Sequence, residues 1–256
     1  METLGHRPRK RFGQNFLVDP HYVRRIVDAV VPQRGQRIVE IGPGLAALTQ
    51  GLIERAGHID AIELDRDLAA QLRTRFAPDT LTLHEGDALE FDFGVLGDGL
   101  RIVGNLPYNI STPLLFHLMP FAAQIADVHV MLQKEVVARM AAAPGTADYG
   151  RLTVMLQVQF RVTRLFVIPP GAFRPAPKVD SAFVRLVPLR ADAPRVADPD
   201  RFARIVAAAF GQRRKTLRNA LAAICDERAL RHAGIDPGAR GETLSVADYV
   251  RLASSV

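Results

Sequence analysis

The sequence predicts an α/β fold, in which helices cover a mainly parallel sheet, followed by a small helical domain. Short apolar runs typical of buried strands alternate with helical patterns over residues 37–142. Two further strand-like runs, 162–167 and 182–187, have no helix between them, which favours an antiparallel pair that closes a mixed sheet. Beyond residue 190 the patterns are helical only. We therefore expect a sheet domain over 1–190 and a helical domain over 191–256.

The individual elements follow from caps, breakers and apolar spacing. Asp19 suits the N-cap of a first helix over 20–30, because Pro20 then occupies its first turn. The long proline-rich connection 169–177 between the last two strands is typical of a functional loop. The other expected strands are 37–41, 58–63, 81–84, 100–103 and 128–132, and the other expected helices are 45–56, 68–76, 113–118, 134–142, 152–160, 202–210, 215–224 and 246–252.

The composition is that of an ordinary globular protein and excludes several kinds of site. Hydrophobic residues make up 48% of the 256 residues and charged residues 23%, which leaves ample material for a core. No apolar run reaches the length of about 18 residues that a membrane helix needs, and no secretory signal is recognisable. The single cysteine, Cys225, excludes an internal disulfide and a cysteine-cluster metal site, and the histidines show no ligand spacing. We expect a metal-free cytoplasmic protein.

The positive charge is concentrated at the two ends of the chain. The net charge is +6, of which residues 1–25 carry +4 and residues 191–256 carry +3, so the middle is close to neutral. This distribution favours a polyanionic partner that contacts both ends. Arg214, directly before the expected helix 215–224, and Arg218 within it would point to the same side. Leu217 and Leu221 would be turned to the core. The candidate phosphate contacts are Arg9, Lys10, Arg11, Arg213, Arg214, Lys215 and Arg218.

A glycine-rich turn after the first strand of the sheet indicates a nucleotide-type cofactor. Gly42 and Gly44 form a G-x-G-x-x-A pattern between a strand and a helix, which lets a ligand approach the backbone closely. Glu63 follows 21 positions after Gly42, where its carboxylate can accept hydrogen bonds from a ribose. Glu40 directly precedes the turn and disfavours a nearby pyrophosphate, which favours a sulfonium cofactor over a dinucleotide. Asp87, after the third strand, could accept from an adenine amino group or could serve as a turn or cap residue.

A second motif, Asn105-Leu106-Pro107-Tyr108, follows the fourth strand of the parallel series. Pro107 disfavours the α region for Leu106, so the chain leaves the sheet in an extended conformation. The Asn105 amide oxygen and the Leu106 carbonyl can then both accept hydrogen bonds, and Tyr108 offers a flat face. Two acceptors and an aromatic face suit an exocyclic amino group on a planar base. The alternative is an ordinary Asn-x-Pro turn beside a core tyrosine.

Together these motifs resemble the KsgA-type family, the small-subunit (16S) ribosomal RNA adenine N6,N6-dimethyltransferases, over almost the whole chain. In many methyltransferases the glycine turn has a third glycine where this chain has Ala46. The segments that carry the resemblance are Arg11–Leu17, Glu40–Gly44, Ile62–Asp65, Asn105–Pro113, Leu132–Val136, Pro175–Ser181 and Gln212–Thr216.

The resemblance implies a Rossmann-like sheet that binds S-adenosyl-L-methionine and dimethylates N6 of two adjacent adenosines in a ribosomal RNA hairpin loop. Asn105 would lie between cofactor and target, and the target base would stack between Tyr108 and Phe173, with Leu106 and Pro107 shaping the turn. The alternative for Phe173 is an anchor that packs its loop against the sheet. The implied partner is small-subunit RNA within a precursor small ribosomal subunit, met by a monomer that binds no membrane. The implied cofactor-binding residues are Gln14, Asn15, Leu17, Gly42, Gly44, Glu63, Leu64, Asp87, Ala88 and Asn105.

Other functions compete with this interpretation. One is a large-subunit RNA methyltransferase of the erythromycin-resistance type, a family that typically has Ile at the position of Leu106 and lacks the match over 212–216. Another is an RNA-binding assembly factor that has kept the fold and lost catalysis, against which the intact Glu63 and Asn105–Tyr108 argue. A dehydrogenase is disfavoured, because no residue is evident that would hold a nicotinamide.

Overall fold

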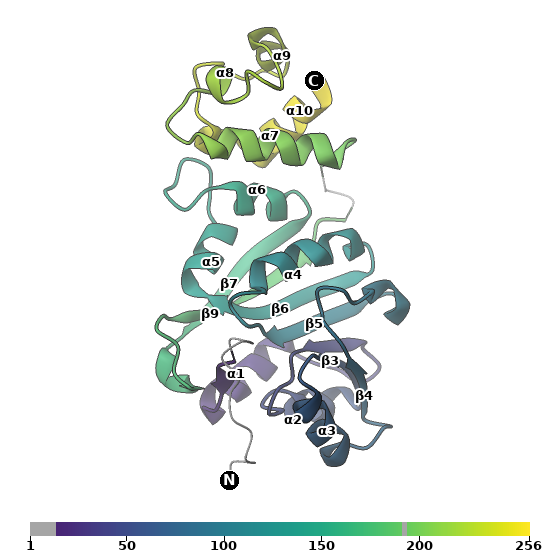
Figure 1. Cartoon of the computed structure of the whole chain (residues 1–256). Helices are drawn as coiled ribbons and strands as arrows, with labels where there is room; N and C mark the ends of the chain where they lie inside the picture. Colours follow the sequence, from purple (N-terminus) through teal and green to yellow (C-terminus); the bar gives the residue numbers. More distant parts are fainter. Residues whose placement is uncertain (1–13, 191–193) are drawn as a thin grey trace. The chain divides into compact units, whose positions relative to one another are not determined.

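The computed structural model describes residues 14–190 and 194–256 of the chain (Figure 1). Within these residues the chain forms two compact units. The first unit comprises the residues up to 137 together with 163–188, and the second comprises 138–162 together with 189–256. The chain passes between the units three times, after residues 137, 162 and 188. The boundary expected at residue 190 lies two residues after the last of these passages, and the membership of 138–162 in the second unit was not anticipated from the sequence.

The described part of the chain contains a seven-stranded mixed sheet with the strand order β4-β3-β2-β5-β6-β9-β7. β2 pairs in parallel with β3 and β5, β3 with β4, and β5 with β6, whereas β9 pairs antiparallel with β6. The expected α/β class and the mixed sheet are therefore confirmed. The strands are β2 (Ile38–Ile41), β3 (Ile59–Glu63), β4 (Leu81–Glu85), β5 (Leu100–Asn105), β6 (Ile125–Gln133), β7 (Phe160–Ile168) and β9 (Ser181–Pro188).

Helices α1 (Pro20–Val30), α2 (Thr49–Ala56) and α3 (Arg66–Arg75) contribute to one hydrophobic core cluster with the sheet, and α4 (Ser111–Leu118) crosses in front of β5 and β6 in Figure 1. α1 begins as expected, with Asp19 accepting from the His21 N–H and Pro20 in the first turn. α2 begins four residues later than expected, at Thr49, because Ala46 has a left-handed backbone with φ 63°. The chain therefore makes a wide turn before this helix, and that turn borders the site described below.

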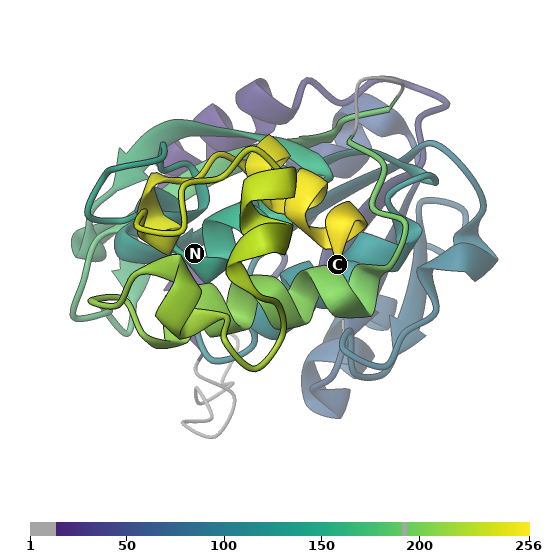
Figure 2. The same ribbon diagram turned by 90° about the horizontal axis from the view of Figure 1, so that it is seen from above.

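The second unit contains α6 (Arg151–Gln157), α7 (Pro199–Gly211), α8 (Leu217–Ala220), α9 (Glu227–His232) and α10 (Val246–Ser255), and α5 (Lys134–Met140) leads into it. Figure 2 shows α7 and α10 lying side by side, and both helices bury apolar side chains. The predicted helix 215–224 is wrong in extent, because α8 has only four residues and turns follow it. The predicted helix 152–160 ends at Gln157, and β7 already begins at Phe160. α9 was not predicted.

A buried ionic network ties the end of α1 to the sheet. The Arg101 guanidinium donates to the carbonyls of Val30 and Val31 at 2.7 and 3.1 Å and to both carboxylate oxygens of Asp127 at 3.0 Å. Arg185 also donates to Asp127, at 3.2 Å. Burial alone would raise the pKa of Asp127, but the neighbouring His129 and Arg101 outweigh burial and hold it well below its usual value. This network supplies the otherwise unpaired carbonyls at the helix end with donors.

None of the helices in residues 14–190 and 194–256 has both the length and the apolar character that a bilayer crossing requires. Over the same residues, no cluster of three or more His, Cys, Asp or Glu side chains is arranged to hold a metal ion.

Candidate active site

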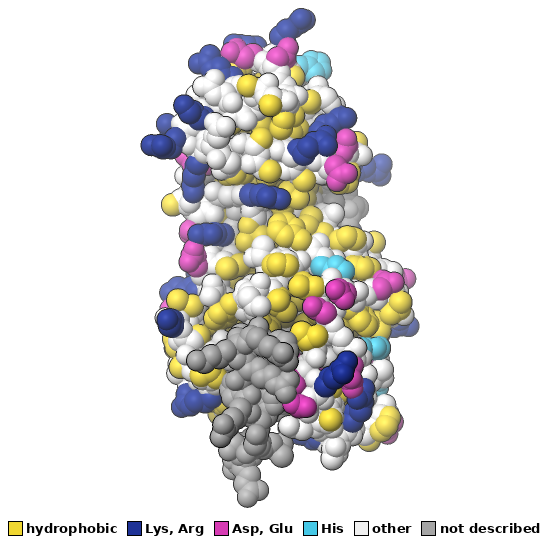
Figure 3. Space-filling view, viewed as in Figure 1, with side chains coloured by type: hydrophobic (Ala, Val, Ile, Leu, Met, Phe, Trp, Pro, Cys, Tyr) yellow, Lys and Arg dark blue, Asp and Glu magenta, His cyan; other side chains and the backbone are white. Residues whose placement is uncertain are grey.

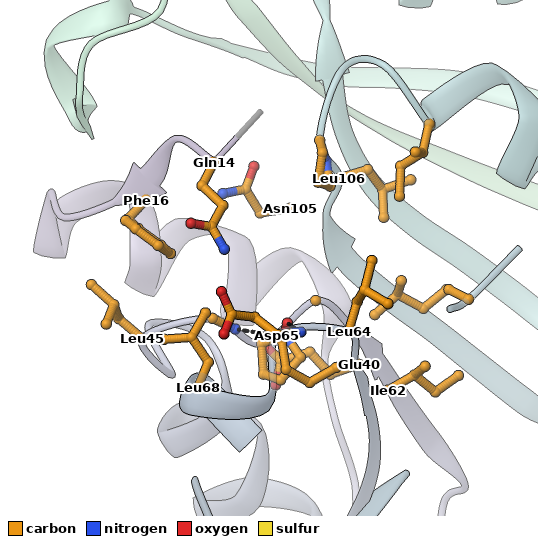
Figure 4. A pocket seen from close by; sticks show the side chains of 18 of the residues that line it. Gln14, Phe16, Glu40, Leu45, Ile62, Leu64, Asp65, Leu68, Asn105 and Leu106 are labelled. Atoms are coloured by element: carbon orange, nitrogen blue, oxygen red, sulfur yellow. Dashed lines mark hydrogen bonds between the residues drawn. The ribbon is translucent and has the colours of Figure 1, made fainter. Parts of the chain in front are cut away.

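A cavity of about 290 Å³ lies in the first unit at the carboxyl ends of β2, β3, β4 and β5 (Figure 4). In the sheet order, the chain proceeds from β2 through β3 to β4 on one side and then returns to β5 on the other side of β2. A reversal of this kind separates the loops that follow adjacent strands and leaves a crevice between them, which is where open α/β sheets bind ligands. The topology therefore accounts for the position of the cavity.

The glycine turn after β2 forms one wall of the cavity. Gly42 and Gly44 both have positive φ, at 65° and 57°, a conformation that glycine adopts without strain. The Glu63 carboxylate, at the end of β3, accepts from the Gly44 N–H at 3.1 Å and from the Asp65 N–H at 2.9 Å. These two backbone donors hold the Glu63 side chain at the cavity wall, and each oxygen keeps a further acceptor site.

The described lining contains four carboxyl groups and no lysine or arginine. The four belong to Glu40, Glu63, Asp65 and Asp87. Burial, opposed in part by Thr49 and reinforced by the charge of Glu63, raises the pKa of Glu40 to about 8. Burial also raises the pKa of Glu63. Burial disfavours the anionic form of both carboxyls, and a nearby cation would stabilise it, so this wall suits a positively charged ligand and opposes a phosphate.

The Asn105–Tyr108 turn forms the wall that faces the N-terminal segment. The Asn105 Nδ2 group donates to the Asn15 carbonyl at 2.9 Å, which leaves the amide oxygen as the acceptor end of the side chain. In Figure 4 the Asn105 and Gln14 side chains lie close together at the edge of the cavity. Leu106 anchors the turn, with its side chain 1% exposed and its N–H donating to the Met131 carbonyl at 3.3 Å. No donor to the Leu106 carbonyl is found among the described residues.

Tyr108 is held at both ends. Its hydroxyl forms a 2.8 Å hydrogen bond with the Ser181 hydroxyl, and its carbonyl accepts from the Ser111 hydroxyl at 2.9 Å. The ring is partly exposed at the cavity, and burial raises the pKa of its hydroxyl. The tyrosine is therefore neutral and fixed in place, with part of its surface open to the cavity.

The N-terminal segment reaches the cavity through a small sheet that was not predicted. β1 (Phe16–Leu17) pairs antiparallel with β8 (Phe173–Arg174), so the N-terminal motif and the proline-rich loop meet. Phe173 is 1% exposed and packs in the hydrophobic core, away from the cavity lining. The prediction that Phe173 offers a stacking face is therefore wrong, and its burial in the hydrophobic core agrees with the alternative, an anchor of its loop.

The structure brings almost all of the predicted small-molecule site together. A single cavity is lined by Gln14, Asn15, Leu17, Gly42, Gly44, Glu63, Leu64, Asp87, Ala88, Asn105, Leu106, Pro107 and Tyr108. Sequence reasoning did not assign Phe16, Leu45, Asp65 and Leu68, which also line it. For Phe16 the sequence held a signal, since this residue lies between the predicted Asn15 and Leu17. In the structure its ring lies close to the glycine turn, because a Cβ on Gly44 would approach the ring to 3.1 Å.

The predicted RNA contacts have different surroundings from one another. Arg9, Lys10 and Arg11 lie outside the described residues. Arg213 pairs with Glu242 at 2.8 Å and donates to the Ala147 carbonyl at 2.7 Å, so it braces two loops of the second unit. Arg218 lies 3.5 Å from Glu227. The predicted shared helix face is wrong, because Arg214 precedes α8, although Leu217 and Leu221 are fully buried as expected.

Arg214 and Lys215 are exposed, and neither has an ion pair within the described part of the chain. On the face of the second unit seen in Figure 3, basic side chains are scattered among acidic and apolar ones. Of the four cations predicted in this segment, these two are therefore the most accessible to an external anion.

Comparisons with known proteins place the chain in a family. The family model for ribosomal RNA adenine dimethylase matches residues 5–256. The chain is 62% identical to ribosomal RNA small subunit methyltransferase A of Aromatoleum aromaticum over 251 residues, covering 98% of this chain and 95% of the relative. It is also 62% identical to the protein of the same name from Thiobacillus denitrificans, covering 95% and 96% of the two chains.

Two solved structures share the fold over nearly the whole chain. A dimethyladenosine transferase from Plasmodium falciparum superposes with a TM-score of 0.81 at 25% identity, covering 93% of this chain and 95% of that one. The 23S rRNA methyltransferase ErmE superposes with a TM-score of 0.73 at 27% identity, covering 94% and 99%. With a family model that spans almost every residue and relatives at 62% identity, the chain belongs to the ribosomal RNA adenine dimethylase family.

Proposed function

We propose that this chain transfers methyl groups from S-adenosylmethionine to the N6 amino groups of two adjacent adenosines in a small-subunit ribosomal RNA hairpin loop. Membership of the adenine dimethylase family supports the reaction class. The observation that carries the proposal is the junction of two features in one cavity, the acid-lined glycine turn and the Asn105–Tyr108 turn. The first suits a cationic nucleoside cofactor, and the second suits an adenine amino group.

The residues of the cavity fit this cofactor by charge and by shape. S-adenosylmethionine carries a methyl group on a positively charged sulfur together with an ammonium group. Glu40 and Glu63 would stabilise positive charge and hydrogen-bond donors, whereas a pyrophosphate would meet four carboxyl groups and no lysine or arginine. Glu63 would hold the ribose through its free acceptor sites, and Asp87 would accept from the adenine amino group. Asn15, Leu17 and the backbone at Gly42 would enclose the methionine end.

The Asn105 amide oxygen and the Leu106 carbonyl would accept the two N6 hydrogens of the target adenine. The N6 lone pair is normally delocalised into the ring, and this pairing would favour a pyramidal nitrogen with its lone pair directed at the methyl carbon. The bound cofactor would supply a methyl carbon whose bonding electron pair would remain on sulfur as the nitrogen–carbon bond formed, and the methylated cationic nitrogen would release a proton to water. Because no strong base is needed, positioning supplies a large part of the rate enhancement.

The target base must leave its stack to reach the cavity. Tyr108 would then provide one face for the extruded ring, a contact worth about 1–3 kcal/mol per base. With Phe173 buried, the clamp that we propose has this single aromatic side chain.

The RNA outside the target loop would be held by phosphate contacts. Arg214, Lys215 and Arg218 are the proposed contacts in the second unit, together with Arg9, Lys10 and Arg11 at the N-terminus. Arg213 we assign to bracing, since its guanidinium already joins Glu242 and Ala147. We further propose that the substrate is a precursor small ribosomal subunit, met in the cytoplasm by a monomer of this chain.

The proposal is tested by methyl transfer to ribosomal particles. The purified chain is incubated with radiolabelled S-adenosylmethionine and small subunits from cells that lack it, and the methylated nucleotides are mapped. We expect label at N6 of two adjacent adenosines of the small-subunit RNA. Label confined to large-subunit RNA would assign the chain to the other methyltransferase type, and binding without label would make it an assembly factor.

Asn105→Ala tests the role of the acceptor pair in the same assay. This substitution should reduce turnover by about 10²-fold or more, as removal of one preorganised hydrogen-bonding group does in other enzymes. Cofactor affinity, measured by calorimetry, should change little. Turnover close to that of the unsubstituted chain would show that the Asn105 amide does not orient N6.

A further inference from the structure

Tyr108 belongs to a loop rather than to a helix or strand. It lies between the end of β5 at Asn105 and the start of α4 at Ser111. A tyrosine in such a place has several staggered rotamers available, and only some of them would keep its ring at the cavity. The 2.8 Å bond between its hydroxyl and that of Ser181 fixes the far end of the side chain and so selects one of them.

Ser181 is itself rigidly placed. It is 0% exposed and is the first residue of β9, where it pairs with Gln133, the last residue of β6; both strands have neighbours on either side in the sheet. The preceding residue, Asp180, is tied to the start of α5 twice. Its carbonyl accepts from the Lys134 N–H at 2.9 Å, and its carboxylate pairs with the Lys134 ammonium at 3.1 Å. Because Ser181 is fixed in the sheet, its hydrogen bond fixes the Tyr108 ring relative to the sheet.

We propose that Ser181 is a positioning residue for methyl transfer, which holds the Tyr108 ring in the place where the target base stacks. The inference rests on the proposed function, because it matters only if a base stacks on Tyr108. It also gives a task to two segments that carried the family resemblance without an assigned role. The segment Pro175–Ser181 supplies the serine, and Leu132–Val136 supplies the lysine that fixes the residue before it. Sites of this kind depend on supporting hydrogen bonds that lock the groups touching the substrate.

A double-mutant cycle tests the proposal. Ser181→Ala, Tyr108→Phe and the double variant are compared for kcat/KM with undermethylated small subunits, with melting temperature and cofactor affinity measured in parallel. One neutral hydrogen bond is worth about a 2- to 12-fold change in an equilibrium or rate. We expect each single variant to lose kcat/KM by a factor in that range, with cofactor affinity unchanged. The double variant should lose no more than the larger single loss.

The Tyr108→Phe background separates positioning from a purely structural role. If Ser181 merely stabilised the sheet, its removal would reduce activity by the same factor whether or not the tyrosine hydroxyl is present. Equal factors in the two backgrounds, or full activity of Ser181→Ala, would overturn the proposal. Ser254→Ala is the matched control, since its hydroxyl donates to a carbonyl within α10 at 3.0 Å, and it should leave kcat/KM unchanged.

A substitute variant covers the case in which Ser181→Ala is unstable, and two further outcomes separate the failure of the proposed function from the failure of the inference. If Ser181→Ala melts too early to assay, Ser181→Cys keeps the side-chain volume and replaces the oxygen by a weak acceptor, and the same cycle is expected from it. If the unsubstituted chain transfers no methyl group to the particles, the proposed function fails and the inference fails with it. If transfer occurs but the cycle is additive, only the role of Ser181 is wrong.

Discussion

Gly104 is a test of how closely the Asn105–Tyr108 turn must approach the glycine turn. It precedes Asn105 on β5 and does not line the cavity, so its replacement removes no ligand contact. A Cβ at this position would lie 2.8 Å from the Ile41 carbonyl oxygen and 3.0 Å from the Leu106 Cδ2 atom. The Gly104 backbone has no positive φ, so the contacts alone oppose Gly104→Ala.

The size of the effect follows from these contacts. Ordinary contacts of a Cβ begin near 3.4 Å, so β5 and the end of β2 must separate by about 0.6 Å to admit the methyl group. Overpacking of this kind destabilises a protein by about 1–3 kcal/mol. Displacement of a catalytic group by about 1 Å can reduce turnover about 10²-fold, so a shift of this size should reduce it about tenfold or more.

The assay measures kcat for methyl transfer to undermethylated small subunits, together with the free energy of unfolding in urea. Gly171→Ala is the matched control, because a Cβ at Gly171 meets no atom within 4 Å and its φ is not positive. The control should behave as the unsubstituted chain does. If Gly104→Ala kept both full turnover and full stability, the close approach of the two turns would be irrelevant, and the argument from geometry would be refuted.

Three other perturbations have defined outcomes. Arg101→Met should lower the free energy of unfolding by about 3–5 kcal/mol in urea, because it leaves Asp127 buried with fewer partners. Because the pKa of Asp127 is held well below 3.8 in the folded chain, the stabilisation that its ionised carboxylate gives the unsubstituted chain is present above pH 3.8 and declines as the pH falls below that value. The pKa of Glu40 is raised from 4.5 to about 8, so the cofactor-free chain should lose stability relative to Glu40→Gln as the pH rises through that interval, by about 1.4 kcal/mol per pH unit. A stability difference that does not depend on pH would contradict the burial argument. The salt dependence of RNA binding should flatten, with cofactor affinity unchanged, when alanine replaces Arg214, Lys215 and Arg218; an unchanged slope would exclude these residues as phosphate contacts.

The parallel part of the fold could be predicted because its signals are local. Buried strands such as β2 are short, mainly apolar runs, and α1 carries its own cap at Asp19. The glycine turn, Glu63 and Asn105 could be placed in one cavity because the carboxyl ends of parallel strands share an edge of the sheet. Each of these inferences needs only short segments and the rules of sheet topology.

The misplaced features depend on contacts between distant segments. The β1–β8 pair joins residues separated by more than 150 positions, and it includes Phe173, which is buried although the proline-rich connection around it suggested a functional loop. The start of α8 at Leu217, after the basic run, has a similar cause. Arg213 is held by Glu242 and Ala147, and the Leu217 N–H donates to the Ala239 carbonyl, so the helix cannot extend back through the basic run. The sequence pattern at 212–218 does not indicate that Glu242, Ala147 and Ala239 contact this segment.

The threefold passage of the chain between its two units has a practical consequence for anyone who wishes to dissect it. The segment 138–162 is bounded on both sides by residues of the first unit, yet its helix α6 packs against α7 from the C-terminal part. A fragment that stops at residue 190 would keep α6 while deleting the helix that covers its apolar side. A fragment that starts at residue 191 would keep α10 against α7 but would remove α6 from it. We expect both pieces to aggregate on expression, so point substitutions rather than truncations are the suitable means to separate methyl transfer from RNA capture.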